Sequence, residues 1–383
     1  MQAIIPFRRP GIYIPEFDGL RAVAVLAVMA GHAAVLDHPI RGSACGFIAV
    51  RFFFVLSGFL ITGILLDHVV SSRNRGRSLA AFLVRRGLRI FPAYFAFLIF
   101  FLLIGNSFVW ETIGWTATYA SNFAFAFVTK GGPPITHFWT LAVEEQFYLI
   151  WPLALICLSR TPKLLGAVLL LGVASAVTFR ELALNYELTR PQLLYLPISS
   201  LDSLLLGAAS AILLRNPSRF ADRLVNLLRR VGIFVAAPML CCGLLSIPLG
   251  WDLGFNLLTT GQWLTALAAT GIVIHYASQP SRGIVSRILL NRQLRYLGMI
   301  SYGMYLYHFP IDRIIYERIM MQQLGLPDHF LLHFSFVCIC TTAIATLSWY
   351  LLEKPILGWK HRFPYDASIP QIPTATTPLR KAA

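Results

Sequence analysis

Ionisable residues occur inside segments of the chain that are otherwise apolar. Arg21 and His32 lie in the first such segment, and Glu145 lies in a later one between residues 138 and 157. A charge in hydrocarbon costs roughly 2.5–3.5 kcal/mol on insertion scales, so such residues usually face a cavity and serve a function. A histidine beside a carboxylate can take a proton from a hydroxyl, because the carboxylate orients the ring and stabilises the imidazolium. This combination indicates general-base chemistry.

Helix geometry predicts that His32 and Glu145 meet in the outer half of a membrane. Arg21 and His32 are separated by about three helical turns, or ~16 Å, so they share one helix face at different depths. The same rise places His32 ~21 Å from a helix start near Asp18, and Glu145 ~10 Å below the outer surface. A histidine that only bridges two helices is the alternative interpretation of His32 taken alone.

Other polar residues inside the apolar segments are predicted to line the same cavity, and His308 is expected nearer the midplane. They are Arg51, Glu144, Asp202, Ser301, Tyr305, His308 and Asp312. Ser301, Tyr305 and His308 recur at i, i+4 and i+7, so they form one stripe of a helix. For Arg51, Asp202 and Asp312, a structural ion pair is the slightly favoured interpretation.

A cluster of arginines precedes the third apolar segment. Arg86 and Arg89 are three residues apart, so they lie on one helix face. Guanidinium groups bind phosphate in a bidentate manner, which suits a clamp for a donor that approaches from the cytosol. Binding of anionic lipid is an equally favoured alternative. We assign Arg86 and Arg89 to the donor site, together with Asp18.

The composition predicts an all-α polytopic membrane protein. Of the 383 residues, 57% are hydrophobic and 13% are charged, whereas a soluble domain carries about 25% charged residues. This excludes an ordinary soluble enzyme. Windows of about 20 apolar residues, the length that spans a bilayer, predict ten transmembrane helices near 17–36, 46–66, 90–109, 138–157, 164–180, 194–214, 231–249, 258–277, 297–316 and 330–352.

The surplus of positive charge is explained by membrane topology. The net charge is +15, which in a soluble protein would suggest a nucleic-acid partner. With these ten helices, 24 of the 32 Lys and Arg residues fall on the side of the N-terminus and six fall on the opposite side. Cytoplasmic loops collect Lys and Arg, so both termini are predicted to be cytosolic. We expect membrane lipids and no nucleic acid as partners.

The chain shows no sign of a second domain or of a metal site. We expect one membrane-embedded domain over 13–360, a disordered cytosolic tail over 361–383 and no appended soluble domain. The six cysteines show no CxxC pair, and no Cys/His spacing fits zinc. Ser57 and Gly58 indicate close helix packing rather than a nucleophile elbow, because the G-x-S-x-G spacing is absent.

Six short motifs follow one another along the chain. They are Phe17-Asp18-Gly19-Leu20-Arg21 with His32 eleven residues on, the stretch from Phe52 to Ile61, Arg86-x-x-Arg89, the stretch from Trp139 to Tyr148, the stretch from Ser301 to His308, and Glu353-Lys354-Pro355. Together they resemble the acyltransferase-3 family of integral membrane acyltransferases. The family includes bacterial O-acetylases of lipopolysaccharide, exopolysaccharide and nodulation factors.

The resemblance implies transfer of an acyl group, usually acetyl from cytosolic acetyl-CoA, to a carbohydrate hydroxyl at the bacterial inner membrane. It implies no permanently bound cofactor, because acyl-CoA is a substrate. By resemblance, His32 and Arg21 are the essential pair, and Arg86 and Arg89 are linked to the donor. Many members carry Asp where this chain has Arg51, so no role is carried over to that residue.

These observations lead to one hypothesis and one alternative. Acyl-CoA would dock on the cytosolic arginines and pass its thioester beyond Arg21 toward His32. Oriented by Glu145, His32 would either deprotonate the acceptor hydroxyl of a carbohydrate or glycolipid or carry the acyl group as a nucleophile. The alternative is a secondary transporter or flippase for a polar solute or lipid-linked sugar, because charges and a histidine within the membrane also suit proton coupling.

Overall fold

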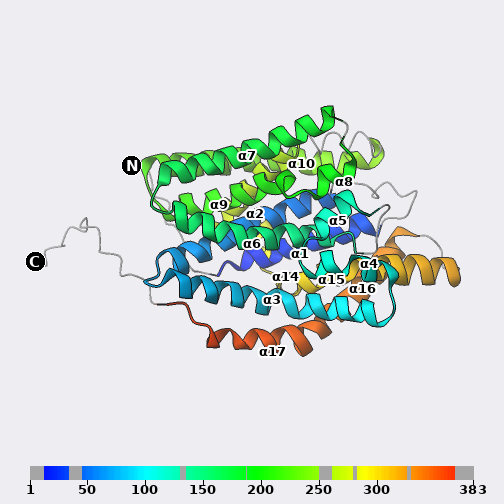
Figure 1. Cartoon of the computed structure of the whole chain (residues 1–383). Helices are drawn as coiled ribbons and strands as arrows, with labels where there is room; N and C mark the ends of the chain where they lie inside the picture. Colours follow the sequence, from blue (N-terminus) through cyan, green and yellow to red (C-terminus); the bar gives the residue numbers. More distant parts are fainter. Residues whose placement is uncertain are drawn as a thin grey trace, which may run out of the picture.

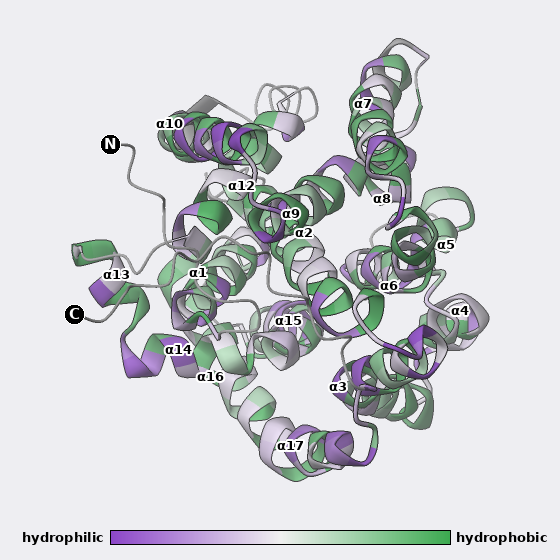
Figure 2. Ribbon diagram, turned by 90° about the vertical axis from the view of Figure 1, so that its left-hand side faces the viewer, coloured by the Kyte–Doolittle hydropathy of each residue, from purple (hydrophilic) through white to green (hydrophobic). Residues whose placement is uncertain are grey.

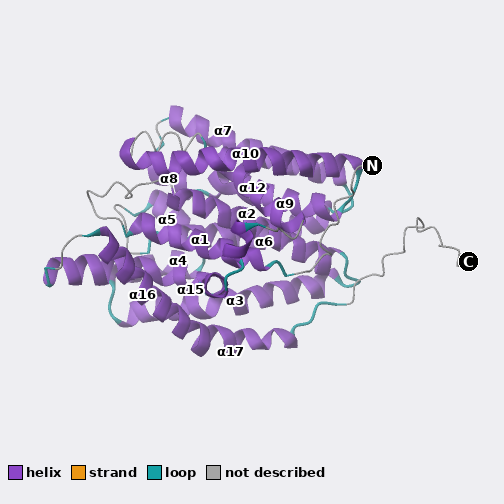
Figure 3. Cartoon of the chain, turned by 180° about the vertical axis from the view of Figure 1, so that it is seen from behind, coloured by secondary structure: helices purple, strands orange, loops and turns teal. Residues whose placement is uncertain are grey.

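The structure is a computed structural model that describes residues 13–33, 45–129, 135–186, 188–249, 261–278, 283–325 and 329–366. These residues form helices joined by loops, and no β-strand occurs among them (Figure 3). The predicted all-α fold is therefore confirmed for the described part of the chain.

The helices range from single turns to segments long enough to cross a bilayer. In chain order they are α1 (Pro15–His32), α2 (Cys45–Leu65), η1 (Leu66–Val70), α3 (Arg75–Leu103), α4 (Ser107–Ala117), α5 (Ser121–Phe127), α6 (Phe138–Leu158), α7 (Pro162–Asn185), α8 (Arg190–Tyr195), η2 (Pro197–Ser200), α9 (Leu201–Arg215), α10 (Arg219–Leu249), α12 (Gln262–Ser278), α13 (Ile284–Leu289), α14 (Arg292–Met299), α15 (Ser301–Pro310), η3 (Ile311–Gln323), α16 (Phe330–Ser348), η4 (Trp349–Glu353), α17 (Lys354–Leu357) and η5 (Gly358–Arg362).

The chain is a multi-pass membrane protein. Among the described residues, seven helical spans are long and apolar enough to cross a membrane: Cys45–Val70, Arg75–Leu103, Phe138–Leu158, Pro162–Ala183, Pro197–Arg215, Arg219–Cys241 and Phe330–Arg362. The predicted number of ten stays a prediction. The other three windows fall on α1, which carries charges near its start, on α12, which is short, and on α15, which continues into the charged segment η3. Residues 1–12 and 367–383 lie outside the described residues, so the cytosolic placement of both termini also stays a prediction.

The long helices lie side by side with nearly parallel axes (Figure 1). Viewed end-on, α1, α2, α9 and α15 occupy the middle of the bundle, while α7, α10 and the helix that ends in α17 lie at its edge (Figure 2). The burial of the spans agrees with this arrangement. In the span that includes α2, 67% of the apolar window is buried inside the protein, whereas in the span of α7 only 11% is buried. The central helices are therefore the ones that can enclose a site.

The third membrane helix begins earlier than the sequence predicts. Helix α3 starts at Arg75 rather than near residue 90, and Asn74 caps it by accepting a hydrogen bond from the Arg77 amide at 3.0 Å. The arginines before residue 90 were left out of the predicted span because they are charged. A helix can nevertheless continue through arginines, because their aliphatic stems pack on apolar surface while the charged ends reach a polar environment. Arg86 and Arg89 are thus fixed on a rigid helix.

Two glycines set the distance between α2 and α9. A Cβ atom on Gly58 would lie 2.0 Å from the carbonyl oxygen of Leu204, and one on Gly207 would lie 2.0 Å from that of Val55. Neither position has room for a side chain. The close packing predicted at Gly58 is therefore present, and it brings the backbones of the two helices into direct contact.

The first residues of the expected disordered tail are in contact with the bundle. The backbone amide of Asp366 donates to Ser78 Oγ at 3.0 Å, and its carboxylate accepts from the Asn74 amide at 2.9 Å. The ring of Tyr365 stacks on His68. Residues 361–366 are therefore held in place, and 367–383 lie outside the described residues.

Candidate active site

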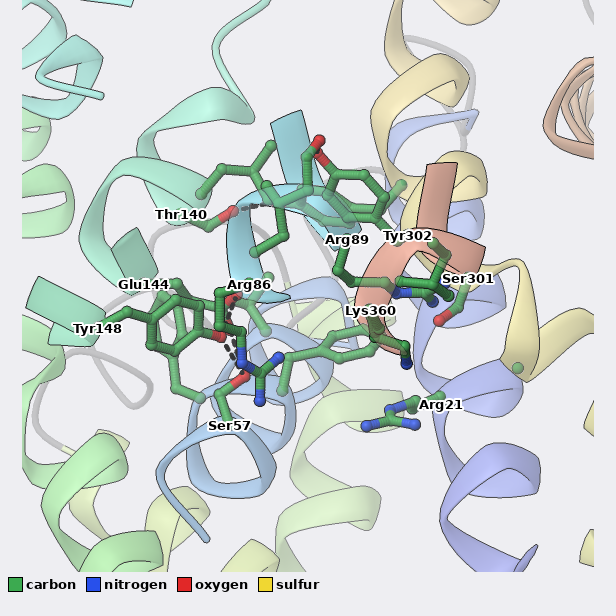
Figure 4. A pocket seen from close by; sticks show the side chains of 18 residues that line it. Arg21, Ser57, Arg86, Arg89, Thr140, Glu144, Tyr148, Ser301, Tyr302 and Lys360 are labelled. Atoms are coloured by element: carbon green, nitrogen blue, oxygen red, sulfur yellow. Dashed lines mark hydrogen bonds between the residues drawn. The ribbon is translucent and has the colours of Figure 1, made fainter. Parts of the chain in front are cut away.

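A cavity of about 410 Å³ lies in the middle of the bundle. Its polar lining comes from several helices that are far apart in the sequence, namely α1, α2, α3, α6 and α15 together with η5 (Figure 4). The polar residues that line it are Arg21, Ser57, Arg86, Arg89, Thr140, Glu144, Tyr148, Ser301, Tyr302, Tyr305 and Lys360. Its size lies within the ~300–1,000 Å³ of typical ligand sites.

Four cationic side chains gather at this cavity: Arg21, Arg86, Arg89 and Lys360. The guanidinium carbon of Arg86 lies 5.3 Å from the centroid of the Tyr148 ring. Arg89 donates to the carbonyl oxygen of Met299 at 3.2 Å. The arrangement suits an anionic ligand, because several guanidinium groups converge in a partly desolvated space. The two arginines assigned to the donor site thus line one cavity with Arg21.

Glu144 is the carboxylate that faces this cavity. It accepts hydrogen bonds from Ser57 Oγ at 2.7 Å and from the Tyr148 hydroxyl at 3.2 Å. Figure 4 shows these three side chains together on one wall, opposite Arg21 and Ser301. Ser57 therefore anchors a cavity carboxylate, in addition to its place beside the close contact at Gly58.

Glu145 does not meet His32 as the sequence analysis expected. It follows Glu144 on α6, but of these two carboxylates only Glu144 belongs to the described lining of the cavity. Glu145 is buried, and its Oε1 has no hydrogen-bond partner among the described residues. The phenol groups of Tyr94 and Tyr119 are near enough to interact with it electrostatically.

The partner of His32 is His308. Nδ1 of His32 lies 3.0 Å from Nε2 of His308, and the two ring centroids are 5.1 Å apart. The His32 ring also packs edge-on against Phe309. His308 is fully buried, whereas His32 at the end of α1 is partly exposed. The structure thus joins two histidines that the sequence analysis placed in one cavity without pairing them.

The hydrogen bonds of His308 determine which nitrogen of His32 is free. Nδ1 of His308 lies 2.7 Å from the carbonyl oxygen of Tyr305, which can only accept, so this nitrogen carries the proton. A buried imidazole without a carboxylate partner is favoured in its neutral form, because burial penalises charge. Nε2 of His308 is then an acceptor, and Nδ1 of His32 donates to it. Nε2 of His32 therefore holds a lone pair that a proton or an acyl carbon can use.

A thin wall separates the cavity from the histidines. Tyr305 and Thr140 line the cavity, with their hydroxyl oxygens 2.7 Å apart, and Tyr305 also holds His308 through its backbone. The ring of His137 packs against the ring of His308, with the centroids 5.1 Å apart. Nε2 of His137 lies 3.1 Å from the Leu306 carbonyl oxygen. His137 was not predicted as a site residue, because it lies just before the predicted helix 138–157.

Three residues that were predicted to line the cavity form separate ion clusters. Asp202 pairs with Arg180 at 2.7 Å and with Arg51 at 3.8 Å, and all three side chains are buried. Arg51 also donates to the carbonyl oxygen of Ser199 and to Gln262. The favoured alternative of a structural ion pair fits Arg51 and Asp202, because every charge in the cluster has an opposite charge or a carbonyl beside it.

Asp312 likewise lies in a cluster of its own. Its Oδ1 is 2.6 Å from Nε2 of His333 on α16, and its Oδ2 is 3.4 Å from the Arg313 guanidinium. The His333 ring stacks on Tyr316 with centroids 3.9 Å apart. These contacts tie the π-helical segment η3 to α16. Of the predicted lining set, the cavity therefore keeps Glu144, Ser301 and Tyr305, with His308 directly behind its wall.

Asp18 is not among the described residues that line the cavity, but its side chain is bonded to Arg21, which lines it. Its Oδ1 lies 3.2 Å from Nη1 of Arg21, and its Oδ2 accepts a hydrogen bond from the Tyr13 hydroxyl. Burial and this hydrogen bond raise the pKa of Tyr13. Asp18 thus orients a cavity arginine. Within the described part of the chain, no group of three His, Cys, Asp or Glu residues is placed to hold a metal ion.

Residues 14–350 match the sequence model of the family Acyl_transf_3, described as an acyltransferase domain. The chain belongs to the acyltransferase-3 family. The match includes the histidine pair and most of the cavity lining, but it ends before Lys360. No solved structure matches the chain significantly.

Curated members of the acyltransferase-3 family resemble the chain over most of its length. A putative peptidoglycan O-acetyltransferase of Bacillus subtilis is 32% identical over 370 residues, which is 90% of this chain and 55% of the relative. A peptidoglycan O-acetyltransferase of Listeria monocytogenes is 30% identical over 362 residues, 90% of this chain and 56% of the relative. An O-acetyltransferase of Staphylococcus aureus is 26% identical, with 90% and 57% covered. The chain thus spans little more than half the length of these relatives.

Proposed function

We propose that this member of the acyltransferase-3 family transfers an acetyl group from cytosolic acyl-CoA to a hydroxyl of a cell-wall carbohydrate such as peptidoglycan, with His32 at the reacting centre. The observation that carries the proposal is the free Nε2 of His32, held by His308 just beyond a cavity lined with cations. The names of the relatives supply the acetyl group and the class of acceptor.

The reaction needs one group that accepts a proton and returns it. In the general-base route, Nε2 of His32 takes the proton of the acceptor hydroxyl while its oxygen attacks the thioester carbonyl. The carbon–sulfur bond breaks, a carbon–oxygen bond forms, and the proton passes to the thiolate. In the nucleophilic route, Nε2 attacks the thioester carbon and the thiolate leaves as the carbon–sulfur bond breaks. The acceptor hydroxyl then attacks the same carbon, the carbon–nitrogen bond breaks as the carbon–oxygen bond forms, and the hydroxyl proton passes to the thiolate. Both routes use the same lone pair, and the hydrogen bond from His32 Nδ1 to His308 keeps it available.

The cavity provides a route for the donor. Phosphate groups would bind Arg86, Arg89 and Lys360, and the slender thioester arm would pass Arg21 toward Tyr305 and Thr140. From Arg21 to His32, α1 rises ~16 Å. The wall of Tyr305 and Thr140 would have to admit the thioester, by a change in side-chain rotamers.

The experiment measures O-acetyl groups on the cell wall of cells that express either the wild type or His32→Ala at equal membrane levels. His32→Ala should abolish the acetate that the wild type adds. His329→Ala, which removes an exposed histidine far from α1 in sequence, is the matched control and should leave acetylation unchanged. Undiminished acetylation by His32→Ala would overturn the proposal.

A second measurement separates an acyltransferase from a transporter that uses the same cavity. Purified protein should hydrolyse acetyl-CoA slowly in the absence of an acceptor, and His32→Ala should abolish this hydrolysis. A transporter would show no hydrolysis in either form.

A further inference from the structure

A second cavity, of about 350 Å³, adjoins the first at the end of the bundle where α3 begins. It is lined by Ile64, His68, Phe82, Arg85, Arg86, Arg89, Leu357, Lys360 and Tyr365. Four of these residues, Arg86, Arg89, Leu357 and Lys360, also line the first cavity. The two cavities therefore lie against each other and share this part of their walls, which carries three cationic side chains.

The second cavity has a surplus of positive charge. Four of its lining residues are cationic, namely Arg85, Arg86, Arg89 and Lys360, and no carboxylate side chain lines it among the residues that the structure describes. The nearby Asp67 is already bound by Arg215, with distances of 2.8 and 2.9 Å. An anionic ligand with more than one charge would stabilise this arrangement, because charge-assisted hydrogen bonds to guanidinium groups are strong in a desolvated site.

One wall of the second cavity comes from the segment 363–366, which follows the last helix. The carbonyl oxygen of Phe363 accepts a hydrogen bond from Arg85 at 3.3 Å, and the guanidinium carbon of Arg85 lies 4.6 Å from the centroid of the Tyr365 ring. The ring of Tyr365 also stacks on His68, with the centroids 4.5 Å apart and an interplanar angle of 2°. Tyr365 thus holds Arg85 in position at the cavity.

The same segment is fastened at its far end to the start of α3 by the two hydrogen bonds of Asp366 to Asn74 and Ser78. The match to the acyltransferase-3 family ends at residue 350. The wall formed by 363–366 is therefore a feature of this chain that family membership does not assign.

We propose that the second cavity binds the phosphate groups of the nucleotide part of the donor, with Arg85 and Lys360 as phosphate ligands and Tyr365 as the residue that positions Arg85. The inference rests on the proposed function for the identity of the donor, since a phosphorylated nucleotide joined to a slender arm fits two adjoining cavities. Nucleotide phosphate and lipid headgroup phosphate share the same chemistry. The position of the second cavity against the interior cavity, with Arg86, Arg89 and Lys360 common to both, favours the nucleotide.

The test uses the full chain in lipid nanodiscs of zwitterionic lipid, with adenosine 3′,5′-bisphosphate as the probe. The probe lacks the thioester arm, so its binding reports on the second cavity alone. It should bind the wild type and compete with acetyl-CoA. Arg85→Ala should raise its dissociation constant by roughly ten- to hundredfold, the effect of losing a hydrogen bond between charged groups. Arg73→Ala removes an exposed arginine close by and is the matched control.

Tyr365 is tested as a positioning residue. Tyr365→Ala should weaken binding of the bisphosphate, and Tyr365→Phe, which keeps the ring under Arg85, should restore it. In acetyl transfer, Tyr365→Ala should raise the KM for acetyl-CoA more than it lowers kcat. Equal loss of affinity in the Ala and Phe variants would overturn the role assigned to the ring.

Two further outcomes would overturn the site itself. Equal weakening by Arg85→Ala and Arg73→Ala would mean that only general surface charge attracts the probe. Loss of bisphosphate binding when phosphatidylglycerol replaces part of the zwitterionic lipid would mean that the cavity binds a lipid headgroup. Because bisphosphate binding needs no acyl transfer, the inference stands if His32→Ala leaves acetylation unchanged. If acetylation depends on His32 but the bisphosphate does not bind, the proposed phosphate site is overturned and the proposed function is not.

Discussion

Nδ1 of His32 and Nε2 of His308 lie 3.0 Å apart, although 276 positions separate the two residues in the chain. The contact joins the end of α1 to α15, and the Tyr305 carbonyl oxygen fixes the proton on the far side of the second ring. His308 therefore controls which nitrogen of His32 can react. It does so without a carboxylate.

The first prediction concerns this control. His308→Ala should lower kcat for acetyl transfer by roughly a hundredfold or more, because His32 then loses the acceptor that fixes its proton on Nδ1. His308→Gln offers a carbonyl oxygen to the same proton and should recover part of the activity. Activity is measured as labelled acetate moved from acetyl-CoA to acceptor by purified protein. Wild-type kcat in His308→Ala would show that His32 needs no fixed tautomer.

The second prediction compares two adjacent carboxylates. Glu144→Gln weakens the contacts to Ser57 and Tyr148 in the cavity and should lower kcat/KM by about tenfold, the effect of one hydrogen bond to a charged group. Glu145→Gln should change kcat/KM less, because Glu145 is not among the described residues that line the cavity. Steady-state kinetics of both variants shows which of the two carboxylates contributes more to kcat/KM. A larger effect of Glu145→Gln would restore the pairing with His32 that the sequence suggested.

The histidine pair illustrates what the sequence could and could not predict. Periodicity and apolar length predict the helices, and the rarity of charge in the membrane singles out His32, Arg21 and His308. The fixed rise per residue gives the position of each residue along its own helix. The neighbour of a residue could not be predicted in this way, because it depends on the rotation of each helix about its axis and on the order in which the helices pack. The rise led to Glu145 as the partner of His32, whereas the packing of α1 against α15 selects His308.

The same limit explains the residues that changed their assignment. Arg51, Asp202 and Asp312 are as deep and as polar as the cavity residues, but their partners Arg180 and His333 come from helices whose placement the sequence does not reveal. In the sequence, Lys360 is one of several positive charges near the C-terminus, and it was not predicted as a site residue. Its place in the cavity follows from the helix that continues without a break from α16 to η5.

The third prediction concerns the stability of the buried ion cluster. Asp202→Ala leaves Arg51 and Arg180 buried without their common partner and should lower the free energy of unfolding by about 3–5 kcal/mol. Thermal unfolding of the purified protein in detergent measures the effect. Asp222→Ala, an exposed carboxylate on α10, is the matched control and should leave the melting temperature nearly unchanged. If both variants melt alike, the cluster contributes no net stability.

The fourth prediction tests the contact between α2 and α9. Gly58→Ala places a Cβ atom 2.0 Å from a backbone oxygen, so the helices must separate and the melting temperature should fall. Gly166→Ala, in α7, meets nothing within 4 Å and should raise stability slightly, by about 0.5–1 kcal/mol, because alanine favours the helix. Similar behaviour of the two variants would mean that α2 and α9 adjust freely.

The fifth prediction concerns the arginines of α3. Arg89→Ala should raise the KM for acetyl-CoA by about tenfold or more while the KM for the acceptor stays within about twofold, because Arg89 lines the cavity that we propose holds the donor. Kinetics with each substrate varied in turn provides the comparison. Equal increases in both KM values would instead indicate anchoring to lipid.

The rise of ~16 Å from Arg21 to His32 covers about half the hydrocarbon thickness of a bilayer. In the proposed reaction, an acetyl group that reaches His32 would have passed through that half of the hydrocarbon layer, while the coenzyme that delivers it stays on the cytosolic side. Movement of the acetyl group through the membrane and formation of the ester would then be a single event, driven by the free energy of the thioester. Such a device would work without an ion gradient, so acetylation by the purified protein in sealed vesicles should continue when an uncoupler collapses the membrane potential.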